Sequence, residues 1–176
     1  PYFSIRDYGT GLSHDQVSNI YTTYFESTKT NSNDFIGALG LGSKSPFSYT
    51  DNFSVIAIQN GKRGVYTAFI NEHGVPSIAL MSESDTTDPN GVEVKFAVND
   101  RYDFDKFRTE ARIVYKHFAH RPVVSGNANF EFVNPSYSEK DIIPGVHVSD
   151  SSLSHSVAIM GNIAYPINVP DSDKSL

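Results

Sequence analysis

The chain has 176 residues, of which 39% are hydrophobic and 12% aromatic, so it can bury a core and is not a disordered segment. Its formal net charge is −6, whereas proteins that bind the backbone of nucleic acids normally carry excess lysine and arginine. We therefore expect no specific nucleic-acid partner. The absence of cysteine excludes disulfides, thiolate metal sites and a cysteine nucleophile.

The first expected elements are a strand, a glycine turn and the start of a helix. Apolar and polar residues alternate over 2–6, which predicts a strand that the chain enters part-way. Because no Met precedes that strand, we interpret the sequence as a piece of a longer protein. The run from Asp7 to Gly11 is a turn, and Ser13 can cap a helix with Gln16 three residues further on.

A polar stretch and a glycine cluster follow. Ser, Thr and Asn dominate from Thr22 to Asp34, which indicates a mobile loop. The run DFIGALGLGSKSPF, residues 34–47, then places three glycines just before Lys44. A short helix is expected from Ser43 to Tyr49. Pro46 is tolerated in it only because it falls in the first turn.

The next segments predict an antiparallel meander and one long helix. Asn60-Gly61 between two alternating runs is a strong hairpin signal. Apolar residues at three- and four-residue spacing predict a helix from Asp103 to His120, ended by Pro122 and covering one face of the sheet. The expected strands are Phe53–Gln59, Val65–Ile70, Val75–Met81 and Val92–Val98, with shorter ones at Asn129–Val133 and His155–Ile159.

These elements predict the later part of a two-layer α/β sandwich, with a mixed, largely antiparallel sheet and helices on one face. We place a domain boundary near Arg121 to Ser125. Residues 1–121 would then form the first domain, and residues 122–176 would begin a second α/β or β-rich domain.

Three kinds of phosphate site compete for the glycine cluster. Gly37 and Gly42 have the separation of a P-loop, but Ser43 stands before the lysine and the upstream segment is polar. The dinucleotide fingerprint lacks its third glycine, because Ser45 takes that place. The third arrangement joins the cluster to Asp7, whose carboxylate can accept a hydrogen bond from the adenine amine. The N-terminal amides of the helix after the glycine cluster would then bind phosphate, and the polar stretch before the cluster would form a lid over the nucleotide.

The motifs Asp7-x-Gly9-x-Gly11, Thr28-Lys29 and Ile36-Gly37-x-x-Gly40-x-Gly42 resemble those of the GHKL ATPases, which include gyrase, large heat-shock chaperones, histidine kinases and MutL. The resemblance spans roughly residues 2–120. The run from Tyr24 to Phe53 is similar, more narrowly, to the rIIA family of lysis-inhibition and exclusion-protector proteins of T-even-type phages.

The resemblance implies a Bergerat-type fold that binds ATP, with Mg²⁺ in the full-length protein. Asp7 would contact adenine, and Lys29 and Lys44 would reach phosphate. One departure is Gly91-Val92, where many members have Gly-Thr, so that a hydroxyl is lost and base affinity would be weaker. The implied nucleotide-binding residues are Asp7, Gly9, Gly11, Lys29, Gly37, Leu39, Gly40, Leu41, Gly42, Ser43 and Lys44.

The family carries its general base and its Mg²⁺-binding Asn on a helix before the first strand, and this chain begins after that point. We therefore assign no catalytic residue and expect no fast hydrolysis from these residues alone. In the full-length protein the resemblance implies slow ATP hydrolysis with lid closure or dimerisation, in the cytoplasm of an infected host. It also implies a homodimer or a phage or host protein as partner, with peripheral membrane association.

Simpler interpretations stand beside these. Asp7 could cap a turn, the glycines could allow close helix–sheet packing, and Lys29 could be a surface charge. His117 and His120 have the spacing of two metal ligands but no evident third, so we expect no metal site. The alternative function is a non-catalytic protein-interaction module on a degenerate fold of this family, and a P-loop protein is the third candidate.

Overall fold

The computed structural model describes residues 1–22, 42–126, 129–143, 146–149 and 156–167. The chain forms two compact units, Pro1–Asn99 and Asp100–Leu176. The sequence analysis expected the boundary further along the chain, between residues 121 and 122. The helix predicted from Asp103 therefore belongs to the second unit. The functions expected for residues 1–121 and 122–176 stay predictions.

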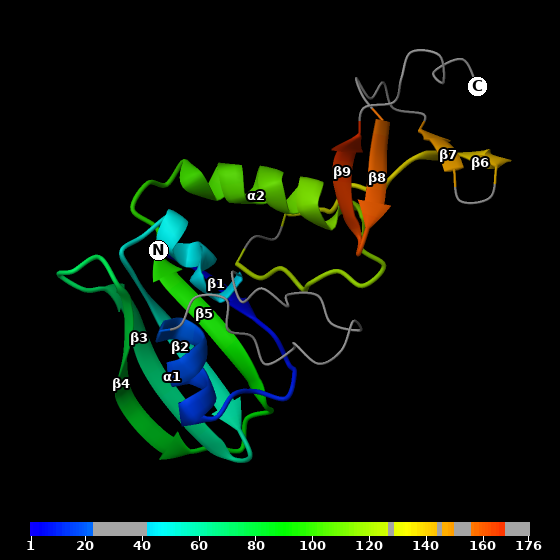
Figure 1. Ribbon diagram of the computed structural model, residues 1–176. Helices are drawn as coiled ribbons and strands as arrows, with labels where there is room; N and C mark the ends of the chain where they lie inside the picture. Colours follow the sequence, from blue (N-terminus) through cyan, green and yellow to red (C-terminus); the bar gives the residue numbers. More distant parts are fainter. Residues whose placement is uncertain (23–41, 127–128, 144–145, 150–155, 168–176) are drawn as a thin grey trace. The chain divides into compact units, whose positions relative to one another are not determined.

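The first unit is built on a five-stranded sheet in the order β1-β5-β2-β3-β4 (Figure 1). Each neighbouring pair in this sheet is antiparallel. The expected α/β fold with an antiparallel sheet is confirmed, and the described residues contain no parallel pair. The strands are β1 (Tyr2–Arg6), β2 (Asn52–Gln59), β3 (Lys62–Ile70), β4 (Pro76–Asp85) and β5 (Gly91–Ala97).

The hairpin between β2 and β3 closes as predicted. Asn60 and Gly61 both have positive φ, 52° and 77°, which a two-residue type I′ turn requires. Strand β4, in contrast, continues beyond the predicted end at Met81. Residues 82–85 pair with residues 62–65 of β3 at the exposed edge of the sheet. Because an exposed edge strand needs no apolar side chains, its hydrophobic pattern stops before the strand does.

Helix α1 (His14–Thr22) lies over one face of β2 and β3 and encloses the core (Figure 1). The predicted capping box is present: the Gln16 N–H donates to Ser13 Oγ at 3.3 Å, and the Ser13 N–H donates to Gln16 Oε1 at 2.9 Å. These bonds satisfy backbone donors that the first turn would otherwise leave without a partner. The buried core residues are Val17, Tyr21, Phe53, Val55, Ala57, Tyr66 and Ala68.

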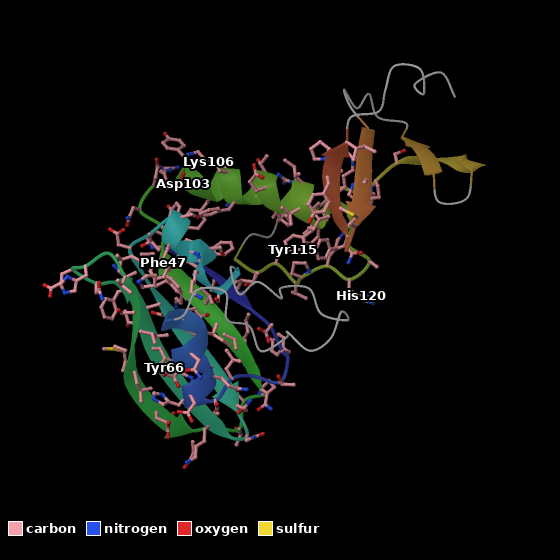
Figure 2. The ribbon with its side chains drawn as sticks, in the orientation of Figure 1. Phe47, Tyr66, Asp103, Lys106, Tyr115 and His120 are labelled. Atoms are coloured by element: carbon pink, nitrogen blue, oxygen red, sulfur yellow. The ribbon has the colours of Figure 1, made fainter. Side chains whose placement is uncertain are left out.

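The short helix after the glycine cluster is a 3₁₀ helix, η1 (Gly42–Ser48), with Pro46 inside it. Phe47 projects from η1, and its ring meets the Phe53 ring edge-on with centroids 4.8 Å apart (Figure 2). This contact fixes η1 to the core that α1 covers.

The second unit begins with α2 (Asp103–Val114), which passes into a 3₁₀ turn, η2 (Tyr115–His117). The sequence predicted this helix to run to His120. It ends earlier because Arg121 Nε donates to the Tyr115 carbonyl at 3.1 Å, and its Nη2 donates to the Lys116 carbonyl at 2.8 Å. Two hairpins follow: β6 (Tyr137–Ile143) with β7 (Val146–Ser149), and β8 (Ser156–Met160) with β9 (Ile163–Ile167).

The strand predicted over Asn129–Val133 was wrong, because this segment is not paired as a strand. Two arginines take the place of a partner strand. Arg112 Nε donates to the Glu131 carbonyl at 3.1 Å, and Arg121 Nη2 donates to the Val133 carbonyl at 3.2 Å. The guanidinium groups also lie over the rings of Phe130 and Phe132, at 5.1 and 5.4 Å from the ring centres.

Candidate functional site

Asp7 lies at the end of β1 and is held at two points. Its backbone N–H donates to the Val92 carbonyl at 3.0 Å, at the start of β5. Its carboxylate Oδ1 accepts the Gly9 N–H at 2.8 Å, which closes an Asx turn. Asp7 therefore does cap a turn, as the simpler interpretation of the sequence expected. A carboxylate offers about four acceptor positions, so one backbone bond leaves this exposed side chain able to accept another donor.

Two glycines allow the Asp7 turn to lie directly against the sheet. A Cβ at Gly11 (φ +73°) would stand 1.8 Å from the Ile58 carbonyl oxygen in β2. A Cβ at Gly91 (φ +148°) would stand 2.1 Å from the Asp7 carbonyl oxygen. Neither approach tolerates a side chain, so Gly11 has a clear packing role whatever it contributes to a ligand pocket. Gly91-Val92, singled out in the sequence as a pair, is in direct contact with Asp7.

Lys44 of η1 is buried, with 7% of its surface exposed. Its ammonium donates to the Ile20 carbonyl at 2.5 Å, in the last turn of α1. Carbonyls at a helix C-terminus carry partial negative charge and lack intrahelical partners, so a lysine there is favourable. Gly42 is exposed, and a Cβ there would meet nothing within 4 Å. Ser43, between them, is half-buried.

Five of the eleven predicted site residues lie outside the described residues: Lys29, Gly37, Leu39, Gly40 and Leu41. The mobile loop expected over residues 22–34 lies almost wholly outside them as well. The phosphate-binding role of these residues stays a prediction. The structure therefore describes the adenine side of the predicted site in full, but the phosphate side only from Gly42 onward.

The last turn of α1 connects both parts of the predicted site. Burial, and after it the negative charge of Asp7, raise the pKa of the Tyr21 hydroxyl above its ordinary value of 10.0. The charge of the Asp7 carboxylate thus acts on the Tyr21 hydroxyl, while the carbonyl of the adjacent Ile20 accepts a hydrogen bond from the Lys44 ammonium. The Tyr21 ring also packs near Phe53, which contacts Phe47 of η1. Lys44 thus binds the residue next to Tyr21, whose hydroxyl lies within electrostatic range of Asp7.

The sequence analysis did not identify Ile20 or Tyr21 as part of the site. The spacing of Val17, Ile20 and Tyr21 marks the buried face of α1, so a pattern was present. That pattern predicts burial but not which partners a residue meets. The contacts of these residues with the glycine segments depend on how η1 and the Asp7 turn pack against the helix.

Two further residues named in the sequence analysis, Ser45 and His117, lie in the described part of the chain. The hydroxyl of Ser45 donates to the Gly42 carbonyl at 2.8 Å. Burial, followed by the charges of Lys116 and Arg121, lowers the pKa of His117. The described residues contain no group of three His, Cys, Asp or Glu side chains that could hold a metal ion. None of the helices in the described ranges is long and apolar enough to cross a membrane.

Comparison with known proteins gave matches among solved structures alone. No family model matches the chain, and no curated protein matches it. It is similar to the ATPase region of topoisomerase II from Saccharomyces cerevisiae, at 16% identity and a TM-score of 0.43 over 65% of this chain. It is also similar to the 43K ATPase domain of gyrase B from Thermus thermophilus, which was solved with an aminocoumarin, at 21% identity and a TM-score of 0.40 over 66% of this chain. The chain spans 36% and 31% of the lengths of these two proteins.

Proposed function

We propose that the chain binds an adenine nucleotide, with ATP as the ligand, between the Asp7 turn and the glycine cluster. Asp7 would accept the adenine amine, while Gly9 and Gly11 would shape the pocket for the ring. The amides of residues 39–43 would hold phosphate, assisted by Gly37, Lys29 and Lys44. The observation that supports this arrangement is that Lys44 binds Ile20 in the last turn of α1, where the charge of Asp7 also reaches the Tyr21 hydroxyl. One nucleotide has to reach both segments.

Lys44 has two alternative acceptors in this proposal. Without a nucleotide its ammonium is bound to the Ile20 carbonyl. A phosphate carries more negative charge than a carbonyl, so binding would draw the ammonium away from the helix end. Nucleotide binding would thereby loosen the contact between α1 and η1, a local change that can accompany lid closure or dimerisation of the full-length protein.

The finer biological role rests on the resemblance of residues 24–53 to rIIA proteins. In this proposal the chain belongs to a phage lysis-inhibition and exclusion-protector protein that acts in the cytoplasm of the infected host. Its partner is a second copy or a phage or host protein, with peripheral membrane association. Mg²⁺ would accompany ATP in the full-length protein, but the described residues contain no ligand set that fits the ion, so no step is assigned to it.

Asp7→Asn tests the adenine contact without removing the turn, because an Asn oxygen can still accept the Gly9 N–H. In the full-length protein, ATP affinity should fall at least tenfold, or about 1.4 kcal/mol, with stability nearly unchanged. Gly40→Ala should weaken ATP binding to a similar extent. Calorimetric titration with ATP and GTP provides the measurement, and Asp88→Asn, on an exposed turn, is the matched control.

Unchanged ATP affinity in both variants would remove the proposed site. Equal affinity for ATP and GTP in the unaltered protein would remove the adenine role of Asp7 in particular. The second candidate, an interaction module without nucleotide, is favoured by Val92 because that side chain has no hydroxyl to offer the base. It predicts no ATP binding at millimolar concentration, with the fold intact.

A further inference from the structure

A cavity of about 270 Å³ lies at the N-terminal end of α1, at the other end of the helix from Ile20 and Tyr21. None of the proposed nucleotide-binding residues lines it. Its walls come from the start of the helix and from one face of β2, β3 and β4. The lining residues that matter here are His14, Gln59, Lys62, Gly64, Tyr66 and Glu83.

One wall of this cavity is a fixed pair of aromatic rings. His14 and Tyr66 are stacked, with ring centroids 5.8 Å apart and an interplanar angle of 20°. Their polar atoms, His14 Nδ1 and the Tyr66 hydroxyl, are hydrogen-bonded at 3.3 Å. Tyr66 can lie there because the next residue on its face of β3 is Gly64, where a Cβ would stand 2.5 Å from the hydroxyl. Tyr66 is 2% exposed, so this wall cannot easily rearrange.

The β4 side of the cavity carries the carboxylate of Glu83. Lys62 Nζ is paired with Asp85 at 2.7 Å, which leaves Glu83 without an ion pair among the described residues. Burial, and after it the charge of Glu83, raise the pKa of the Tyr66 hydroxyl. The charge of Glu83 also contributes to the raised pKa of Lys62, which is caused mainly by Asp85. Lys62 and Glu83 line the cavity and Asp85 does not, but the ion pair with Asp85 neutralises the charge of Lys62. A cation that enters the cavity therefore meets an available carboxylate.

We propose that this cavity binds a guanidinium group, held between the carboxylate of Glu83 and the exposed ring of His14, which stacks on the buried Tyr66. A guanidinium is planar, donates two parallel hydrogen bonds to a carboxylate and stacks on aromatic rings, which an ammonium does less well. Pockets for drug-sized ligands measure roughly 300 to 1,000 Å³. The cavity, at about 270 Å³, lies just below this range and has room for an arginine side chain.

The guanidinium could belong to a small molecule or to an arginine side chain of a partner protein. Agmatine and the tripeptide amide Gly-Arg-Gly represent these two sources. In NMR titrations of the full chain, both should shift the amide signals of Gly64 and Glu83, with millimolar dissociation constants. The tighter of the two probes identifies the source. Urea, a neutral planar analogue of guanidinium, should cause no such shifts.

Glu83→Gln should weaken agmatine binding at least fivefold, because it removes the charge but keeps the size of the side chain. The exposed position of Glu83 on an edge strand makes misfolding of this variant unexpected. Glu72→Gln, on an exposed turn outside the cavity, should bind agmatine as the unaltered protein does. Equal shifts with urea and agmatine, or unchanged affinity in Glu83→Gln, would overturn the proposal. A loss of ATP binding elsewhere in the protein would not affect it.

Discussion

Gly91 approaches the backbone of Asp7 more closely than any residue with a side chain could. An added Cβ would lie 2.1 Å from the Asp7 carbonyl oxygen and 3.2 Å from Tyr8 Cα. These neighbours are backbone atoms, so they cannot rotate away as a flexible side chain could. The position of the aspartate that we assign to adenine thus depends on a glycine in another strand, far away in the sequence.

Gly91→Ala should therefore lower the free energy of unfolding by about 2–4 kcal/mol, through the clash and the unfavourable φ together. Gly74→Ala is the matched control, because Gly74 also has positive φ (+75°) but has nothing within 4 Å of the added Cβ. It should lose only about 1 kcal/mol. Urea denaturation of both variants measures the difference, and equal losses would contradict a role for the clash.

At the scale of elements, α1 organises the first unit through its two ends. Its first turn is closed by the capping box and borders the cavity lined by His14, Tyr66 and Glu83. In its last turn, the Ile20 carbonyl accepts a hydrogen bond from Lys44 of η1, and the Tyr21 hydroxyl is affected by the charge of Asp7. Between these ends, Val17 and Tyr21 bury the apolar face of the helix against β2 and β3. One short helix thus joins segments that are distant in the sequence.

Lys44→Met keeps the buried stem but removes the ammonium, which leaves the Ile20 carbonyl without this donor. The variant should lose about 1–3 kcal/mol of stability, the typical cost of an unsatisfied buried polar group. If Lys44 also binds phosphate, the affinity for ATP should fall more than the affinity for adenosine. Lys62→Met, at an exposed ion pair, is the control for loss of charge. Parallel losses for the two ligands would restrict Lys44 to its structural role.

At the scale of the whole chain, the two units are stabilised differently. The first has a sheet with a buried core, whereas in the second arginine side chains replace backbone pairing over residues 129–133. Arg121 makes four hydrogen bonds, to the carbonyls of Tyr115, Lys116 and Val133 and to Asn134 Oδ1. Loss of these hydrogen bonds from the Arg121 guanidinium should destabilise the second unit but not the first.

Arg121→Lys should raise the hydrogen-exchange rate of amides in residues 115–134 at least tenfold, because a lysine cannot bridge several carbonyls at fixed angles. Exchange in the core strands of the first unit should stay unchanged. Exchange followed by mass spectrometry on the full chain makes the comparison, with Arg101→Lys, an exposed arginine outside this segment, as control. Faster exchange in β2 and β3 as well would show that the two units unfold together.

Short-range patterns in the sequence predicted much of this structure. The alternation over 2–6, the Asn60-Gly61 turn and the Ser13–Gln16 capping box each involve residues within a few positions of one another. Their conformations follow from local sterics and hydrogen bonding, so they could be read without the fold. The Asx turn of Asp7 belongs to the same class.

Contacts between distant segments decided the rest. The extension of β4 and the absence of a strand at 129–133 both depend on partners elsewhere in the chain. The same is true of the contact between Lys44 and Ile20 and of the stacked wall formed by His14 and Tyr66. A sequence pattern shows which side chains are buried, but which atoms they meet depends on three-dimensional packing, and that packing defines both proposed sites.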